Sequence, residues 1–200
     1  MIAPWGVTAT DSFNFVFSLF GLLIGFSLVE VLGGLARTLE ARMGAARREE
    51  RAFHAGWLTP LLGLFVMLDV LSFWGSAWVA REHLSMTGPV LLGGLFFAGS
   101  YYLAAHLIFP GEPTDWPDLD DHYFLVRRPV FAAIMILATV QLTFFLTLPG
   151  FAEAMLGPVV LISAVSFYVL LLAGLLVRGR TANIIVLTLL TLRYLIHYLI

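Results

Sequence analysis

GPVLLGGLFFAGSYYLAAHLIF, residues 88–109, contains no aspartate, glutamate, lysine or arginine. A helix needs about 20 predominantly apolar residues to cross the hydrocarbon core of a bilayer. The stretch is long enough to do so, and it therefore predicts a transmembrane helix. Runs of the same kind along the rest of the chain decide the fold.

Five further apolar runs lie at residues 12–36, 57–80, 129–148, 151–177 and 181–200. The 200 residues are 60% hydrophobic and only 12% charged, with a mean hydropathy of +0.93, whereas about a quarter of a typical soluble domain is charged. We predict an all-α protein, a single polytopic transmembrane domain over residues 1–200 in which about six spans form a helical bundle. Its partner is then the lipid bilayer, and no nucleic acid is expected.

The distribution of arginine predicts the orientation, because basic residues concentrate in cytoplasmic loops. If the N-terminus lies outside, the arginines on the cytoplasmic side are Arg37, Arg42, Arg47, Arg48, Arg51, Arg127, Arg128, Arg178 and Arg180. Only Arg81 then falls in an outer loop. We predict an N-out, C-out topology with cytoplasmic loops at residues 37–56 and 110–128, the first of which extends the first helix before the chain turns back.

Composition also bears on origin and chemistry. All eleven basic residues are arginine, and alanine, leucine and glycine are abundant, which is typical of a GC-rich bacterial genome. We therefore expect a multi-pass protein of the bacterial inner (cytoplasmic) membrane. The absence of cysteine excludes disulfides, iron–sulfur clusters and a cysteine nucleophile.

The ionisable residues inside the predicted spans are Glu30, Asp69, His106, Arg193 and His197. A charged side chain at the centre of a span costs at least about 2.5 kcal/mol on insertion scales, so each needs a partner, a cavity or a route to the interface. At 1.5 Å per helical residue, Asp69 and Arg193 both lie about 18 Å from the cytoplasmic surface. The simplest interpretation makes Arg193 the counter-ion of Asp69. Side chains at similar depth that could complete a hydrogen-bonded layer are Gln141, Ser163 and Ser166.

Two further polar levels follow from the same estimate of depth. Glu30 and His106 share a level nearer the cytoplasmic surface, whereas His197 and His83 lie toward the outer surface. Three hypotheses stay open: structural ion pairs that fix helix register, a polar path for protons or a small ion, and an Arg193 side chain that extends outward to the interface.

Small residues predict close helix packing. Gly21 and Gly25 form a G-x-x-x-G motif, which places two glycines on one helix face, and Gly94 and Ala98 contribute to a similar surface on residues 88–109. These faces could pack within the chain or form an oligomer. We expect the protein to associate with itself or with a larger membrane complex.

The loop before residue 129 holds the polar residues Asp118, Asp120, Asp121, His122, Arg127 and Arg128. Carboxylates and imidazole are ligands for divalent ions, but their spacing here does not define a metal site. We expect a capped helix whose acids pair with Arg127, Arg128 or the arginines after the first span.

Histidines also raise the alternative of a bis-histidine haem. His106 and His197 lie at opposite depths and cannot share one iron, which leaves His54 with His106 or His83 with His197. We predict no metal and no cofactor.

The stretch HLIFPGEPTDWPDLDDHYFLVRRPVF resembles a family of small bacterial inner-membrane proteins. Its pattern is an apolar helix ending in Phe-Pro, a short acidic stretch, an aromatic pair and a double arginine. The matching positions are Phe109, Pro110, Asp118, Leu119, His122, Tyr123, Arg127 and Arg128, with His122 departing from the aromatic expected there. GLLIGFSLVEVLGGLAR looks like the family's opening helix, so the likeness covers about two-thirds of the chain. The resemblance implies a fold and a location, and it transfers no activity or catalytic residue.

No nucleophile-and-base arrangement, phosphate loop or zinc helix is visible in the sequence. We therefore predict a protein that is not an enzyme: an accessory or scaffold subunit that uses its small-residue faces and charged cytoplasmic segments to bind partners. The alternative is a small channel or transporter that moves protons or an ion along the polar levels, with Asp69 and Arg193 as gate or relay.

Overall fold

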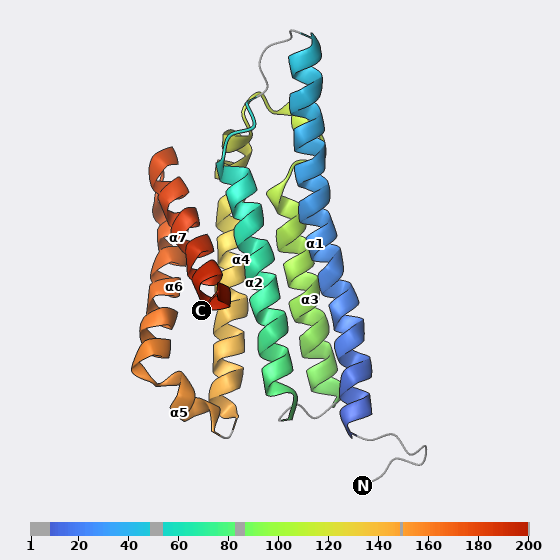
Figure 1. Ribbon diagram of the computed structural model, residues 1–200, viewed down its shortest axis with the longest axis vertical. Coiled ribbons are helices and arrows are strands. Elements are labelled where there is room, and N and C mark those ends of the chain that lie inside the picture. The colour runs from blue at the N-terminus through green and yellow to red at the C-terminus, as the bar shows by residue number, and fades with distance from the viewer. Residues whose placement is uncertain (1–8, 49–53, 83–86, 149, 200) are drawn as a thin grey trace.

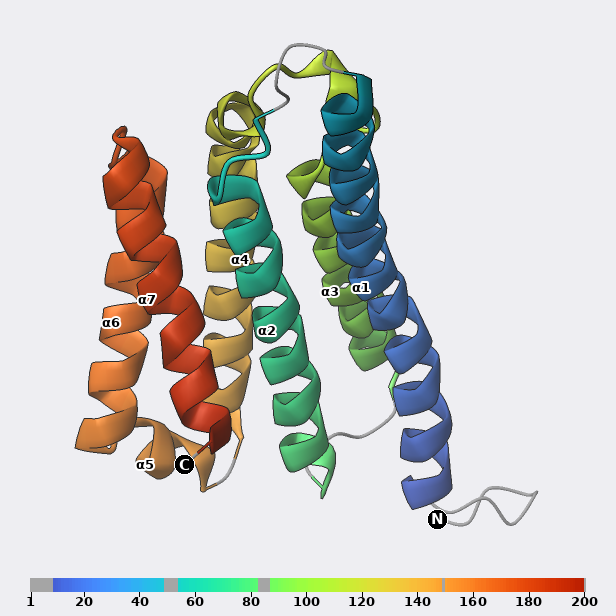
Figure 2. The same ribbon diagram turned by 45° about the horizontal axis from the view of Figure 1, so that its top comes forward.

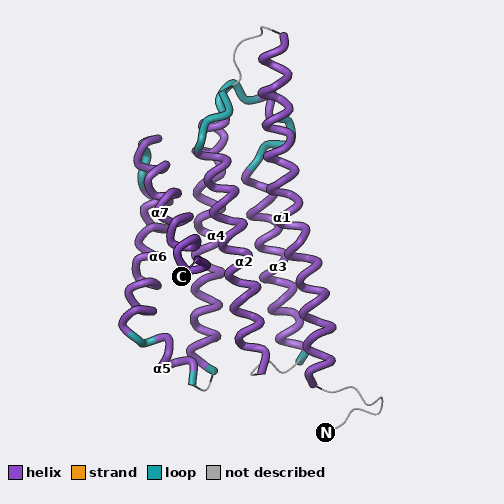
Figure 3. Tube along the Cα trace, in the orientation of Figure 1, coloured by secondary structure: helices purple, strands orange, loops and turns teal. Residues whose placement is uncertain are grey.

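The computed structural model of the chain is built from helices joined by short loops (Figures 1 and 3). It describes residues 9–48, 54–82, 87–148 and 150–199. The α-helices are α1 (Ala9–Arg48), α2 (Leu58–Val79), α3 (Gly88–Ile108), α4 (Leu119–Thr147), α5 (Phe151–Met155), α6 (Pro158–Leu176) and α7 (Arg180–Leu199). Short 3₁₀ turns lie at Ala80–Glu82 and Pro113–Asp115, and the described residues contain no β-strand.

Six of the helices are long and apolar enough to cross a membrane, namely α1 between Val16 and Ala45 and the whole of α2, α3, α4, α6 and α7. The prediction of an all-α bundle with about six transmembrane helices is therefore confirmed, and the chain is a multi-pass membrane protein. Successive long helices run in opposite directions, and the short α5 lies at one end of the bundle (Figure 1).

The long helices form three neighbouring pairs. From one side of the molecule to the other these are α6 with α7, α2 with α4, and α1 with α3 (Figures 1 and 2). The pairs also join across the bundle, because α2 contacts α7 and α3 contacts α4. α2 and α4 are thus the central helices, and large buried side chains that they contribute to the core are Leu62, Phe65, Phe131 and Ile134.

Two of the predicted spans differ from the structure in the residue at which the helix begins. We expected a span from residue 129, where the apolar run begins, but α4 begins ten residues earlier and Pro129 lies inside it. The helix starts where Asp118 caps it: the Asp118 side chain accepts a hydrogen bond of 2.9 Å from the Asp120 amide. The span expected at residues 151–177 is divided into α5 and α6, and here the proline, Pro158, does mark a helix start.

The first helix extends past its apolar part, as predicted. α1 continues through the arginine-containing residues 37–48 and projects beyond the neighbouring helices at the end opposite α5 (Figure 1). The other described arginines of the predicted cytoplasmic segments, residues 127, 128, 178 and 180, belong to the same end, because α4 and α7 begin there and α6 ends there. One end of the bundle is thus rich in arginine, and its orientation in a membrane stays a prediction.

Glycines allow aromatic side chains to pack between helices. A Cβ atom at Gly21 would lie 2.4 Å from the ring of Trp74, and one at Gly94 would lie 2.4 Å from the ring of Phe20. Ala98 is buried, so three of the four predicted small positions pack inside the chain. Gly25 is different, because a Cβ atom there would meet nothing within 4 Å.

Candidate functional site

A polar cavity lies inside the half of the bundle that carries α5. It has a volume of about 530 Å³ and is lined by side chains from α2, α3, α4, α6 and α7. Its polar lining residues are Asp69, Ser72, Ser76, Tyr101, Gln141, Ser163, Tyr168, Arg193, Tyr194 and His197. The volume falls in the range of ordinary ligand-binding cavities, about 300–1,000 Å³.

Asp69 is the buried carboxylate of this cavity. Its side chain lies in the middle of α2 and is 6% exposed. The Tyr101 hydroxyl donates a hydrogen bond of 2.9 Å to Oδ2, and the Tyr194 hydroxyl donates one of 2.5 Å to Oδ1. Both oxygens therefore have a donor, as the low polarity of a membrane interior requires.

Arg193 faces the same cavity but is not bonded to Asp69. Its Nη2 donates a hydrogen bond of 3.0 Å to the Ser163 hydroxyl, and the guanidinium lies 4.7 Å from the ring centre of Phe167 and 5.2 Å from that of Tyr194. The Nε atom is buried without a hydrogen-bond partner. The prediction of Arg193 as the counter-ion of Asp69 therefore fails as a direct contact, because Asp69 takes its hydrogen bonds from the two tyrosines and Arg193 bonds Ser163.

Two of the three side chains predicted to form a layer at this depth, Gln141 and Ser163, line the cavity, and so does His197, which was predicted nearer the outer surface. Ser163 bonds Arg193. Ser166 instead donates a hydrogen bond of 2.8 Å to the Ser163 carbonyl on its own helix. His83 lies outside the described residues.

An apolar layer lies between the cavity and the arginine-rich end. Phe65 from α2 packs against Phe131, with ring centres 6.0 Å apart, and against Phe167 at 6.5 Å. Leu187 and Leu190 from α7 are fully buried in the same core cluster. Beyond this layer, polar contacts made by the first turns of α4 hold the ends of neighbouring helices together. We call this region the tied end.

Arg127 is at the centre of the tied end. The guanidinium donates a hydrogen bond of 2.8 Å to the Gly174 carbonyl and another to the Val177 carbonyl, at the C-terminus of α6. The Asn183 side-chain oxygen accepts a hydrogen bond of 2.7 Å from Tyr123 and lies 3.3 Å from Arg127 Nη1. A cation at a helix C-terminus satisfies free carbonyls and interacts favourably with the helix dipole, so this network joins α4 to α6 and α7.

Asp120 joins α4 to α2. Its Oδ1 accepts a hydrogen bond of 3.2 Å from the Leu58 amide, the first residue of α2. The Thr59 hydroxyl donates a hydrogen bond of 3.0 Å to the Leu119 carbonyl. His54 and Leu119 also pair through their backbones, with a 3.0 Å bond from the Leu119 amide to the His54 carbonyl.

The acids of this loop pair with Arg180 rather than with Arg127 or Arg128, and of the other predicted partners Arg51 lies outside the described residues. Arg180 lies 2.7 Å from Asp118, 3.7 Å from Asp120 and 3.3 Å from Asp121. The predicted capped helix is confirmed. The prediction that Arg127 pairs with an acid of this loop is wrong, since Arg127 caps α6. No ion pair is found for Arg128 in the described part of the chain.

His54, Asp118 and Asp120 offer ligand atoms within 4.8 Å of one another. The Arg180 guanidinium already pairs with both of these carboxylates, so the group is more simply a set of ion pairs than a metal centre.

His122 fixes the end of α3. Its Nε2 lies 3.2 Å from the Leu107 carbonyl oxygen, and its ring meets the edge of Trp116 with centres 5.0 Å apart. The tied end therefore connects the termini of α2, α3, α4, α6 and α7. Much of the stretch that carries the family resemblance forms these contacts.

Glu30 and His106 form the pair that their depth predicted. Glu30 Oε1 and His106 Nδ1 are 2.8 Å apart, joining α1 to α3. Unlike Asp69, this pair is on the outside of the bundle: the side chains of His106 and Glu30 are 61% and 24% exposed. It has no contact with the polar cavity, whose lining residues come from other positions.

Tyr101 and Tyr194, the direct partners of Asp69, were not among the residues predicted at this depth. A phenol can satisfy a carboxylate without a second charge, so tyrosines belong in such a comparison. Tyr194 is adjacent to Arg193 in the sequence, and that adjacency at the depth of Asp69 was the available signal.

Fold and cavity together define a multi-pass helical membrane protein with a polar site inside the bundle. Comparison with models of known protein families, with curated proteins and with solved structures gives no match. The resemblance to a family of small bacterial inner-membrane proteins therefore stays a prediction, and function has to be argued from the site.

Proposed function

We propose that the protein is a small transporter whose polar cavity binds the transported species, with Asp69 as a proton-binding group. The observation that carries the proposal is the cavity itself. A buried carboxylate and an arginine line a space of about 530 Å³, although neither is bonded to the other. Two residues that served only to fix helix register would gain most by pairing directly in a filled core.

The apolar layer beside the cavity supports the same proposal. The lining includes Ser76 near the C-terminus of α2, Val159 in the first turn of α6 and His197 in the last turn of α7. Toward the arginine-rich end the apolar layer around Phe65 and Phe131 follows. Alternating access needs a barrier beside the binding site, and in this proposal the apolar layer is that barrier. A carboxyl group within a span is a usual proton-binding group.

Transport can be tested with purified protein in liposomes, by following proton and cation flux with pH- and potential-sensitive dyes. We expect flux for the wild type and a loss of at least tenfold for Asp69→Asn. Glu153→Gln is the matched control, because it removes an exposed carboxylate on α5 and leaves the cavity unchanged. Equal flux for wild type and Asp69→Asn, or none from folded wild-type protein in either assay, would reject the role of Asp69.

A second candidate function is the accessory or scaffold role. The observation that favours it is the Glu30–His106 pair, which joins two membrane-spanning helices yet presents a half-exposed His106 to the outside. Exposed polar groups at membrane depth are costly unless protein or water covers them. A neighbouring subunit over α1 and α3 would provide that cover.

The scaffold role can be tested by cross-linking, because the chain contains no cysteine. A single cysteine introduced by His106→Cys should form a disulfide between two copies in membranes if the same face of a second copy covers it. Leu172→Cys, on the exposed surface of α6, is the control for random collisions. Equal cross-linking of the two variants would argue against self-association through α1 and α3.

A further inference from the structure

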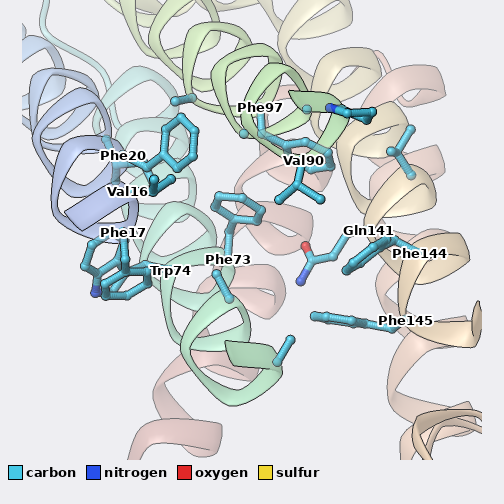
Figure 4. A pocket seen from close by; sticks show the side chains of 18 residues that line it. Val16, Phe17, Phe20, Phe73, Trp74, Val90, Phe97, Gln141, Phe144 and Phe145 are labelled. Carbon is cyan, nitrogen blue, oxygen red and sulfur yellow. The ribbon is translucent and has the colours of Figure 1, made fainter. Parts of the chain in front are cut away.

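A second cavity lies beside the polar one. It has a volume of about 380 Å³ and is lined by α1, α2, α3 and α4. Of its lining residues only Trp74 and Gln141 carry a polar side-chain atom, and the remainder are aliphatic or aromatic. Figure 4 shows Phe73 from α2 and Gln141 from α4 projecting toward its middle.

The two cavities adjoin. Phe73, Gln141 and Phe145 line both of them, so the same three side chains form the boundary between an apolar compartment and a polar one. Gln141 is the one amide at this boundary, where it can contact a polar group on one side and a hydrocarbon chain on the other.

The polar compartment contains an arginine with hydrogen-bonding capacity to spare. Arg193 is positioned by Ser163 and by the rings of Phe167 and Tyr194, while its buried Nε has no partner. The planar guanidinium matches a carboxylate with two parallel hydrogen bonds. The described residues show no hydrogen bond between Asp69 and this guanidinium, and the hydrogen bonds of Asp69 come from the two tyrosine hydroxyls.

We infer that the two cavities together bind a single-chain carboxylic acid, with its carboxylate at Arg193 and its hydrocarbon chain in the apolar cavity. This inference rests on the proposed function and names the substrate class of the same site. A small polar solute would use only the first cavity, and a neutral chain would place no anion beside the Arg193 guanidinium.

Gly93 provides a test of the apolar half. It lines the apolar cavity, and a Cβ atom there would meet nothing within 4 Å. Gly93→Leu should therefore fill part of the cavity without displacing a neighbour. Gly99 is its matched control: it lies on the same helix, a Cβ atom there also meets nothing within 4 Å, and it lines neither cavity.

The experiment is a competition assay on the full chain in lipid nanodiscs, with tritiated laurate as the probe and empty nanodiscs as background. We expect unlabelled laurate to compete at least tenfold better than dodecanol or butyrate. Gly93→Leu should weaken laurate binding about tenfold, the effect of excluding about two methylene groups. Gly99→Leu should bind as the wild type does, and Arg193→Gln should bind laurate no better than dodecanol.

Each half of the inference has its own refuting result. Dodecanol competing as well as laurate would overturn the carboxylate at Arg193, and this comparison needs only wild-type protein, should Arg193→Gln fail to fold. Butyrate competing equally, or Gly93→Leu binding unchanged, would overturn the chain in the apolar cavity. If laurate fails to bind while Asp69-dependent flux is present, the inference fails and the proposed function stands; if both are absent, the proposed function fails as well.

Discussion

Gly56 allows a direct test of the contacts at the tied end. Its φ of +59° lies in the left-handed region, which alanine adopts at a cost of roughly 1–2 kcal/mol. A Cβ atom at this position would lie 2.0 Å from Oδ1 of Asp120, the atom that accepts the hydrogen bond from the Leu58 amide. Gly56→Ala should therefore both strain the backbone and displace the carboxylate that caps α2.

The magnitude follows from these two effects. Loss of a capping carboxylate costs about 1 kcal/mol, so Gly56→Ala should lower the free energy of unfolding by about 2–3 kcal/mol in total. In a chain that already carries Asp120→Ala the clash and the cap are both absent. The glycine substitution should then cost only its backbone strain, about 1–2 kcal/mol.

The measurement is unfolding in detergent micelles, followed by circular dichroism for wild type, both single variants and the double variant. Gly75→Ala is the control, because a Cβ atom at Gly75 in α2 meets nothing within 4 Å and alanine is the better helix former by about 1 kcal/mol. A Gly56→Ala protein as stable as wild type would refute the reasoning. Strict additivity of the two single effects would show that the methyl group and the carboxylate do not meet.

Other changes test the remaining polar contacts by the same unfolding measurement. Arg127→Gln should lower the free energy of unfolding by about 2–4 kcal/mol, because carbonyls at the end of α6 lose a charged donor, whereas Arg128→Gln, at an exposed neighbour, should change it by less than about 0.5 kcal/mol; equal effects would contradict the capping role. Tyr194→Phe should cost about 1–3 kcal/mol by leaving one buried oxygen of Asp69 without a donor, and an unchanged stability would show that this bond contributes nothing. Arg180→Gln should lower the stability only slightly, since the Arg180 side chain is exposed, and the difference should shrink in high salt; a large, salt-independent loss would mean that Arg180 acts through something other than charge.

Element type could be predicted from the sequence because hydrophobic length is a strong signal. Runs such as residues 88–109 have few alternatives to a membrane-spanning helix, and α3 lies within one residue of the predicted bounds. Helix boundaries that are set by polar contacts were harder to predict. α4 begins at an aspartate cap that lies ten residues before the apolar run, and hydropathy does not register a cap.

For the candidate site, the depth of each side chain along its helix could be predicted from the sequence, but the direction in which the side chain points could not. Counting residues along helices matched Glu30 with His106, which are in contact. The same count matched Asp69 with Arg193, which share a cavity but use different partners. Depth fixes one coordinate of a side chain, whereas contact also depends on the rotation of each helix and on which helices are neighbours, and a single sequence specifies neither.

The tied end has a mechanical consequence. Five helices are fastened to one another within the first turns of α4, while the other end of the bundle surrounds the polar cavity. Helices that are held together at one end can separate only by rotating about that end, so their displacement grows with the distance from it. A small rotation of the helices near Arg127 would therefore change the distances between helices around the cavity far more than it changes the contacts at the tied end. Amide hydrogen exchange should be slowest beside Arg127 and fastest near α5.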